Sequence, residues 1–316
     1  MALLLERHEV EPLLDMKGAI EATEEAFRER GQGKVLSRAP TMLHVAHGSL
    51  RTVQGALLES KLIGARLGAA SGFKRGGTLA VLCDSETGEL LAVMSYPFGT
   101  FRTAATTALA TKYLAREDAQ VVGLLGSGRS ALSLLQGVSH VRSVKEIKVY
   151  SRDPDHRKEF AQRASSALGT NVRACFDSSE VLQGSDILLV ATNSKVPVFN
   201  PEAMERGLHV NSMGRPSELD VGVYRRAGLT VVGDRDQELN LDVSGGYSQP
   251  LLKLKEEGFW EGVLELGDVV CGKAGRTSRD EITVFRESQG GWGDVALAKR
   301  VFQQAKELGV GRKVVF

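Results

Sequence analysis

Residues 120–138, QVVGLLGSGRSALSLLQGV, constrain the fold of this chain more than any other segment. An apolar, strand-like run breaks into a glycine-rich turn, and a helical pattern follows at once. The turn matches G-x-G-x-x-A: Gly126 permits the tight turn, Gly128 lets backbone approach a pyrophosphate, and Ala131 allows close packing of helix on strand. The helix start, with Arg129 and Ser130, offers unpaired N–H groups to phosphates. The turn predicts a dinucleotide-binding crevice, and a tight turn without a ligand is the alternative.

Strands and helices alternate after this turn. Short apolar runs predict strands at 121–125, 146–150, 186–191, 208–213 and 229–233, and helical patterns lie between the first four, at 129–139, 155–167 and 200–206. Such alternation is typical of a parallel sheet with right-handed crossovers. The fold class predicted here is therefore α/β, with a Rossmann-like, doubly wound parallel sheet.

The remaining segments have a different texture. Helices are predicted at 15–32 and 102–116, a β-hairpin at 77–96, an irregular region at 40–76, and a final amphipathic helix at 294–309. A chain of 316 residues is too long for one core. We expect a nucleotide-binding domain over 115–294, inserted into a discontinuous α+β domain made of 1–114 and 295–316.

Composition excludes several classes of protein. The net charge is +1, without a basic block, and only 6% of residues are aromatic, so nucleic acid is a poor candidate partner. No stretch of about 18 apolar residues predicts a membrane span, and the N-terminal apolar run is too short for a signal peptide. Three scattered cysteines are typical of a reducing compartment. We expect a cytoplasmic protein without a catalytic metal.

The tip of the second strand, VYSRDPDHR, bears on the choice of coenzyme. An acidic residue there usually holds the ribose of NAD(H), whereas an arginine suits the 2′-phosphate of NADP(H). Ser151 and Arg152 occupy the tip and favour NADP(H). Asp153 keeps NAD(H) open, because it could reach a ribose, although before Pro154 it is also a good helix cap.

Several segments together resemble the ornithine cyclodeaminase/mu-crystallin family. They are FRTAATTALATKYLAR before the glycine turn, DILLVATNSKVPVF after it, LELGDVVCGKAGRTSRDEITVFRESQGG near the end, and DSETGELLAVM in the hairpin. The similarity runs from about residue 36 to the C-terminus. It implies a Rossmann-like domain, and a second domain that forms both the substrate floor and the interface of a homodimer. It also implies hydride exchange at the α-carbon of a small amino or imino acid.

The resemblance carries roles onto particular residues. Arg38 and Arg102 match arginines that meet the substrate carboxylate and the cofactor side of the cleft; a surface salt bridge is the alternative for Arg38. Five further residues match family residues on the cofactor side: Thr78, Thr103, Thr192, Asn211 and Ser288. For each threonine the alternative is a hydroxyl that caps the end of a strand or helix.

Two departures from the family pattern bear on mechanism. Cyclodeaminases carry a lysine where this chain has Arg66, and arginine is a poor proton donor near neutral pH. They also carry an aspartate after the V-N-x-x-G strand end, where no aspartate aligns here without a gap. Glu218 and Asp220 come later and resemble helix-start residues, with Asp220 as a displaced base the alternative.

These departures move the expected chemistry away from cyclodeamination, which needs a positioned base. Reduction of a protonated imine needs only a carboxylate clamp, a hydride donor and exclusion of water. We assign the clamp to Arg38, Arg66 and Arg102. The catalytic candidates are Arg66, Arg102 and Lys74, of which Lys74 could instead be a solvated loop residue. Lys61, His44 and Asp294 are further candidates for proton handling.

Three functions follow as hypotheses. The leading one is an NADPH-dependent reductase of small imino acids, which runs in reverse as an amino-acid dehydrogenase. The second is an ornithine-type cyclodeaminase with a relocated base. The third is a crystallin-like protein that binds NADPH and a carboxylate ligand with little turnover.

Overall fold

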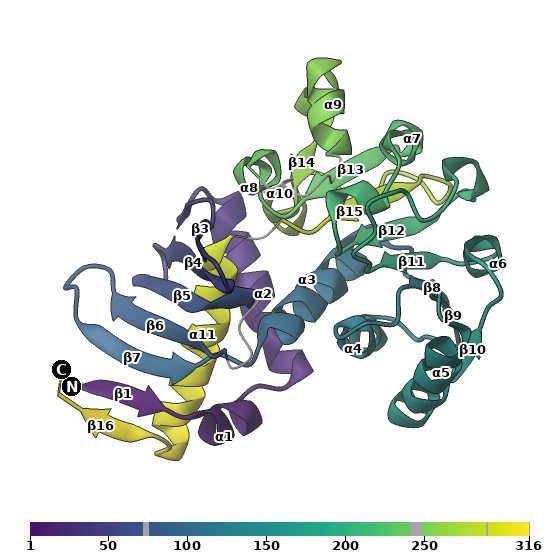
Figure 1. The fold of residues 1–316 in the computed structure, drawn as a ribbon. Helices are drawn as coiled ribbons and strands as arrows, with labels where there is room; N and C mark the ends of the chain where they lie inside the picture. Colours follow the sequence, from purple (N-terminus) through teal and green to yellow (C-terminus); the bar gives the residue numbers. More distant parts are fainter. Residues whose placement is uncertain (72–75, 241–248, 289, 316) are drawn as a thin grey trace. The chain divides into compact units, whose positions relative to one another are not determined.

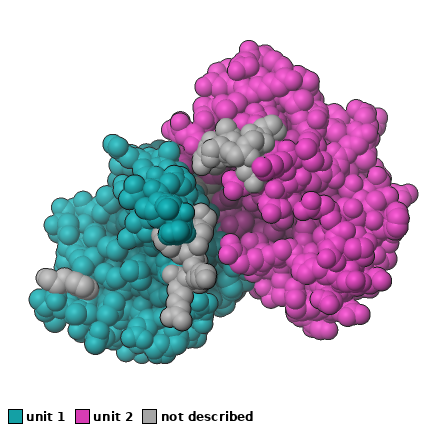
Figure 2. All heavy atoms as spheres, viewed as in Figure 1, with its two compact units in different colours: residues 1–102, 289–316 teal, residues 103–288 magenta. Residues whose placement is uncertain are grey.

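A computed structural model describes residues 1–71, 76–240, 249–288 and 290–315 (Figure 1). The chain divides into two compact units, coloured separately in Figure 2. Unit 1 comprises residues 1–102 and 289–316, and unit 2 comprises residues 103–288. The first division falls inside the helix α3 (Gly99–Leu114) and the second just before the last helix, so the observed boundaries differ from the expected ones after residues 114 and 294.

Unit 1 is built on a sheet that has eight strands among the described residues. Its order is β16-β1-β7-β6-β5-β4-β2, and β3 also pairs with β4. The predicted hairpin is confirmed as β6 and β7, which pair antiparallel. Over residues 48–71 the expectation of an irregular 40–76 region is wrong, because β4 and β5 are long antiparallel strands there. The strands are β1 (Ala2–Leu5), β2 (Val35–Ser37), β3 (Thr41–Val45), β4 (Gly48–Leu57), β5 (Leu62–Ser71), β6 (Thr78–Asp84), β7 (Leu90–Ser95) and β16 (Arg312–Val314).

Unit 1 also contains two long helices, α2 and α11. Helix α2 (Met16–Gly31) confirms the prediction over 15–32, and Asp15 caps it by accepting from the Gly18 N–H. The last helix, α11 (Gly291–Leu308), packs on α2 and on one face of β4, β5 and β6. A Cβ at Gly55 would overlap the backbone of Trp292, so glycine permits the close approach of α11 to β4. The shorter helices are α1 (Arg7–Val10) and η1 (Glu11–Leu13).

Side chains alternate between the two faces of the sheet, and the face opposite α11 carries several exposed apolar side chains. Cross-strand partners place Leu67 opposite Leu79 and Ile63 opposite Cys83 on that face. Ile63 and Leu79 are each 47% exposed and Leu67 is 40% exposed. An apolar stretch of this kind on a sheet is unusual for a surface that faces only water.

Unit 2 confirms the predicted fold class. Its sheet has the order β10-β9-β8-β11-β12-β15-β13-β14, with every pair parallel. The first five strands, numbered along the unit, therefore lie in the order 3-2-1-4-5 of a dinucleotide-binding sheet. The strands are β8 (Val121–Leu125), β9 (Glu146–Tyr150), β10 (Asn171–Ala174), β11 (Ile187–Val190), β12 (His209–Ser212), β13 (Leu229–Val232), β14 (Leu264–Glu265) and β15 (Thr283–Arg286).

Helices connect these strands. The predictions at 129–139 and 155–167 are confirmed by α4 and α5, whereas 200–206 contains only the short turn η2. The helical elements are α4 (Ala131–Val141), α5 (Pro154–Leu168), α6 (Ser178–Leu182), α7 (Val221–Arg226), α8 (Arg235–Leu239), α9 (Pro250–Glu256), α10 (Leu266–Val270), η2 (Pro201–Ala203), η3 (Pro216–Glu218) and η4 (Phe259–Gly262). None of the helices in the described ranges is long and apolar enough to cross a membrane.

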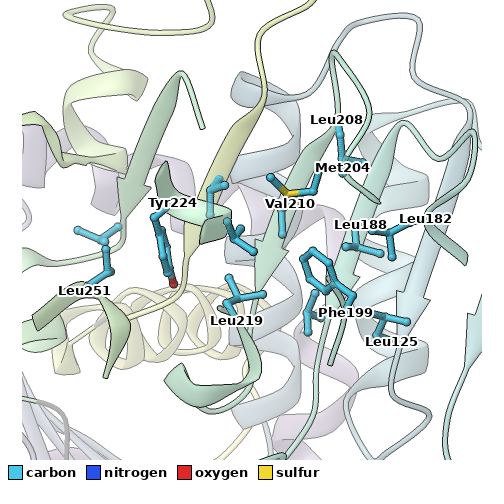
Figure 3. Packing of buried hydrophobic residues seen from close by; sticks show 14 of the residues in the cluster. Leu125, Leu182, Leu188, Phe199, Met204, Leu208, Val210, Leu219, Tyr224 and Leu251 are labelled. Carbon is cyan, nitrogen blue, oxygen red and sulfur yellow. The ribbon is translucent and has the colours of Figure 1, made fainter. Parts of the chain in front are cut away.

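One cluster of buried hydrophobic residues in unit 2 packs around the strands β11 and β12. Leu188 and Val210 project from adjacent strands and pack with Phe199, Leu219 and Tyr224, all of them buried (Figure 3). Central parallel strands are covered on both faces, which explains why VVGLL and ILLV are continuous apolar runs. This packing fixes the carboxyl ends of the strands, where the functional residues lie.

Candidate functional site

A cleft of about 800 Å³ opens at the carboxyl ends of β8, β9, β11 and β12 in unit 2. It lies at the point where the strand order reverses between β8 and β11, which is the usual ligand site of such sheets. The predicted residues that line it are Thr103, Gly126, Gly128, Arg129, Ser130, Ser151, Arg152 and Thr192. The structure therefore brings most of the proposed cofactor set together in one place.

The glycine turn has the geometry that the sequence pattern predicts. Gly126 has φ +108°, and a Cβ there would overlap the carbonyl oxygen of Ala191. At Gly128 a Cβ would meet no atom within 4 Å, so its backbone borders open space. Helix α4 begins directly after the turn, and the first N–H groups of a helix favour an anion. A long cleft with a glycine cradle and a helix N-terminus fits a dinucleotide coenzyme.

A hydrogen-bonded set of side chains joins the glycine turn to the tip of β9. The Ser127 hydroxyl lies 2.9 Å from the Ser151 hydroxyl and 2.8 Å from Nδ1 of His156. Arg152 is exposed and lines the same end of the cleft. Asp153 caps α5, accepting from the N–H groups of residues 155 and 156, so its carboxylate already has the structural role that was considered as an alternative to ribose binding.

Glu218 organises the other end of the cleft. Its carboxylate is fully buried and accepts from the Thr192 N–H at 2.8 Å, the Thr192 hydroxyl at 2.9 Å, the Ser212 hydroxyl at 2.8 Å and the Gly214 N–H at 2.9 Å. Burial raises the pKa of Glu218, while the neighbouring Arg286 and these hydrogen bonds limit the rise. Glu218 therefore fixes two lining residues, Thr192 and Gly214, rather than facing the cleft as a base.

Arg286 extends this buried network on the far side of Ser212. It donates to the carbonyl oxygens of Ser212 and Gly214 and lies 3.6 Å from the carboxylate of Glu238. Burial likewise raises the pKa of Glu238. The loop after β12 is thus fixed by the buried charged side chains of Glu218 and Arg286, which no sequence motif marks.

Two residues of the proposed cofactor set lie away from the lining of the cleft, within the part of unit 2 that the structure describes. Asn211 is fully buried and donates from Nδ2 to the Thr111 hydroxyl at 3.0 Å. Ser288 is buried and exchanges hydrogen bonds with the backbone of Asp234. Asp220, considered as a displaced base, caps α7 through the Gly222 N–H.

In unit 1, a cluster of four polar side chains contains two of the predicted catalytic residues. Nε of Arg66, on β5, donates to Oδ2 of Asp294 at 2.8 Å, and Nε of Arg102 lies 3.4 Å from Oδ1. The Tyr96 hydroxyl donates to the same Oδ1 at 2.8 Å. Asp294 is 2% exposed. The arrangement gathers guanidinium groups around one buried carboxylate, and arginine is the residue best suited to bind a second, ligand carboxylate.

The other predicted residues of unit 1 are placed separately. Thr78 lies at the start of β6, on the same face of the sheet as Arg66, and its side chain packs on Gly68. Arg38 is exposed directly after β2. Lys61 pairs with Glu86 at the surface, 3.0 Å away. Lys74 lies outside the described residues.

The sequence analysis assigned no role in these sites to four side chains that shape them, which are Ser127, His156, Glu218 and Tyr96. Glu218 was interpreted only as a helix-start residue. A signal for Ser127 and His156 was available. Ser127 is the x of G-x-G, and His156 lies in the first turn of α5, directly after the tip of β9 where the adenosine ribose is expected. The roles of Glu218 and Tyr96 depend on contacts with residues distant in sequence. The described residues contain no group of three or more His, Cys, Asp or Glu side chains placed to hold a metal.

The sheet order and the cleft at its switch point define this protein as a dinucleotide-binding protein of the α/β class. Within that class the chain belongs to the ornithine cyclodeaminase/mu-crystallin family, which its residues 1–309 match. The expected family is therefore confirmed.

Three similar proteins extend along nearly the whole chain. The alanine dehydrogenase of Archaeoglobus fulgidus is 32% identical over 329 residues, covering 99% of this chain and 98% of that protein. The structure of Thermococcus litoralis Δ1-pyrroline-2-carboxylate reductase with NADH and L-proline superposes with a TM-score of 0.87, at 32% identity, covering 99% of this chain and 100% of that one. An archaeal alanine dehydrogenase dimer with bound NAD gives a TM-score of 0.88, at 31% identity, covering 100% and 99%. These similarities confirm the predicted enzyme class, an oxidoreductase of amino or imino acids.

Proposed function

We propose that this protein is an NADPH-dependent reductase of small imino acids, which acts in reverse as an amino-acid dehydrogenase. The observation that carries the proposal is the cleft, in which the glycine turn, the start of α4 and Arg152 line one continuous space. The similarity to an alanine dehydrogenase and to a pyrroline-2-carboxylate reductase supports the reaction type.

The preference for NADPH rests on the tip of β9. Arg152 offers a guanidinium and Ser151 a hydroxyl at the position where the adenosine ribose is expected, and a phosphate accepts from both. The carboxylate of Asp153 is engaged with the N-terminus of α5. NAD(H) would need an acidic acceptor for its 2′-hydroxyl, so the charges at this tip favour the phosphorylated coenzyme.

The proposed substrate is a small imino acid held by its carboxylate. Arg66 and Arg102, and Arg38 by its match in the family, supply guanidinium groups for this purpose. A bidentate arginine contact fixes the plane of a carboxylate and hence the orientation of the adjacent C=N carbon. We assign Arg66 and Arg102 the role of substrate clamp, and Lys74 remains a candidate for proton handling.

The residues of the chain perform binding and orientation. The backbone of the 126–130 turn and the start of α4 would hold the coenzyme phosphates, and Thr192 and Gly214, fixed by Glu218, would border its nicotinamide end. When bound, the coenzyme supplies a hydride for the imine carbon. The arginines stay protonated, so the imine nitrogen takes its proton from another group or enters already protonated.

A homodimer is the proposed assembly. The exposed apolar face of the unit 1 sheet, with Ile63, Leu67 and Leu79, would be covered by a second copy. The similar archaeal alanine dehydrogenase is a dimer. We also propose that the protein is cytoplasmic, because its three cysteines are free thiols in the structure.

A matrix of coenzymes and substrates tests the proposed function. NADPH and NADH are each mixed with Δ1-pyrroline-2-carboxylate, Δ1-piperideine-2-carboxylate, and pyruvate plus ammonium, and coenzyme oxidation is followed at the nicotinamide absorbance. We expect oxidation with at least one imino acid and a higher kcat/KM with NADPH. Ammonia release from ornithine without net coenzyme oxidation would indicate a cyclodeaminase, and tight NADPH binding without turnover would indicate a binding protein.

A further inference from the structure

We propose that Asp294 is a positioning residue of the substrate site. Together with Tyr96, it holds the guanidinium groups of Arg66 and Arg102 in the orientation that receives the substrate carboxylate. This inference rests on the proposed function, because it assigns the two arginines to the substrate.

The contacts of Asp294 use both carboxylate oxygens. Oδ2 accepts from Nε of Arg66, and Oδ1 accepts from the Tyr96 hydroxyl, each at 2.8 Å; Nε of Arg102 lies 3.4 Å from Oδ1. A carboxylate anchored at both oxygens has no freedom to rotate. It therefore sets the direction of its two donors, Nε of Arg66 and the Tyr96 hydroxyl, and attracts the guanidinium of Arg102 as an ion pair.

The Arg66 contact leaves the end of its side chain available. Among the described residues, the hydrogen bond of Arg66 to Asp294 runs through Nε, and its guanidinium lies 5.8 Å from the centre of the Tyr96 ring. The two terminal nitrogens of a guanidinium can bind a carboxylate end-on while Nε is occupied. Asp294 thus fixes Arg66 through Nε and leaves the two terminal guanidinium nitrogens to bind a ligand carboxylate.

Two neighbouring, poorly exposed arginines need a negatively charged partner. The side chains of Arg66 and Arg102 are only 18% and 14% exposed, and two guanidinium groups close together in a poorly solvated site repel each other. The carboxylate of Asp294 offsets that repulsion. Burial, and then the charge of Asp294, raise the pKa of Tyr96 well above its usual value of 10, so its hydroxyl stays protonated and continues to donate.

The rigid start of α11 gives Asp294 its precision. Asp294 stands in the first turn of this helix, where a negative charge is favoured. Trp292, two residues earlier, is fully buried and packs edge-on against Phe27 with ring centroids 4.7 Å apart. The close approach of Gly291 to the backbone of Gln54 fixes the same turn against β4. The carboxylate is therefore held by the core of unit 1.

The test compares Asp294→Asn and Tyr96→Phe with a buried carboxylate elsewhere in unit 1. Glu29→Gln is the matched control, because Glu29 is buried and accepts from the Glu59 N–H and the Ser60 hydroxyl. We expect D294N to raise KM for the imino acid by about 10- to 100-fold, the usual effect of losing a charged hydrogen bond. KM for NADPH should change less than about twofold. Y96F should act in the same direction with a smaller effect, and E29Q should lower only Tm.

A double-mutant cycle separates positioning from general stability. If Asp294 acts through Arg66 as well as Arg102, D294N should raise KM by a smaller factor in the Arg66→Gln background than in the wild type. Independent, multiplying effects of D294N and R66Q would overturn the proposal, as would unchanged imino-acid kinetics in folded D294N.

Binding of pyrrole-2-carboxylate, a planar analogue that cannot be reduced, gives a readout besides turnover. Calorimetry should show about a tenfold or greater loss of affinity in D294N. If the wild type binds the analogue and reduces no imino acid, weaker binding by D294N would preserve this inference while the proposed function fails. Equal affinities of wild type and D294N, or no binding by the wild type, would overturn it.

Discussion

The carboxylate of Glu218 accepts hydrogen bonds from both the amide and the hydroxyl of Thr192, at 2.8 and 2.9 Å. Glu218 also holds the Gly214 N–H. Two residues that line the cleft from different strands are therefore fixed by one buried side chain. The position of the cleft wall depends on a residue that does not itself face the cleft.

Replacement of Glu218 by glutamine tests this dependence. The amide group of glutamine keeps the size of the side chain but loses acceptor capacity, so a buried N–H of Thr192 or Gly214 is left without a partner. We expect a loss of about 1–3 kcal/mol in the free energy of unfolding and a several-fold rise in KM for NADPH. Exposed Glu159→Gln is the control. Unchanged Tm and coenzyme affinity in E218Q would show that the network does not support the cleft.

Alanine substitutions at the two glycines of the turn should differ in their effects, one on coenzyme binding and the other on stability. Gly128→Ala should fold normally, because its Cβ meets no atom within 4 Å, and should lose coenzyme binding, because the methyl group occupies space needed by the pyrophosphate. Gly126→Ala should lower Tm, since φ +108° and the carbonyl of Ala191 exclude a Cβ. Thermal unfolding and coenzyme titration separate the two. Full NADPH affinity in G128A would contradict a phosphate-binding role for the turn.

Arg152 is predicted to determine the choice between NADPH and NADH. Arg152→Ala removes a charge-assisted contact to the 2′-phosphate, so KM for NADPH should rise by about 10- to 100-fold while KM for NADH stays within about threefold. Arg163→Ala, on the same α5, is a control with an aromatic contact to Phe160. Equal losses with both coenzymes in R152A would assign Arg152 a role unrelated to the phosphate.

Stability should depend on pH through His209. Burial lowers the pKa of this imidazole to about 3 from its ordinary 6.5. Because only the unfolded chain then binds a proton between these values, stability falls as pH decreases from about 6.5 toward 3. The variant His209→Asn keeps a polar atom for the Thr283 hydroxyl. Its free energy of unfolding should fall by about 2 kcal/mol less than that of the wild type between neutral pH and pH 5. The free energy of unfolding of both proteins is measured by urea denaturation between pH 5 and 7.5. The same dependence on pH in wild type and H209N would contradict the assignment.

The apolar sheet face of unit 1 is predicted to form the dimer interface. Leu67→Lys places a charge on this face and should convert the proposed dimer to a monomer in light scattering, with little change in the fold because Leu67 is already exposed. Leu308→Lys alters another exposed leucine, at the end of α11, and should remain dimeric. A dimeric L67K would place the interface elsewhere.

The fold of unit 2 could be predicted from the sequence because its signals are local. The runs VVGLL and EIKVY are strands with the expected bounds, and the G-x-G-x-x-A turn joins β8 to α4 as the pattern requires. In contrast, β4 and β5 were not recognised within 40–76. Their stability comes from pairing with each other and from contact with α11, which follows them by more than two hundred residues.

The candidate site was predictable to a similar degree. Residues carried by the glycine turn and the strand tips line the cleft, whereas Asn211 and Ser288 were assigned by position along the chain and turn into the interior. Asp294 was recognised only as one of several groups able to handle protons. Its partnership with Arg66 depends on how α11 packs on β5, and no spacing in the sequence reports that contact.

The most direct test of the account is the transfer of an isotope label. NADPH with both hydrogens at the reactive C4 carbon replaced by deuterium is mixed with the enzyme and Δ1-pyrroline-2-carboxylate, and the product is examined by mass spectrometry and proton NMR. We expect L- or D-proline with one deuterium at the α-carbon for each NADPH consumed. Proline without deuterium at that carbon, or no consumption of NADPH with any imino acid tested, would contradict the assignment of this protein as an imino-acid reductase.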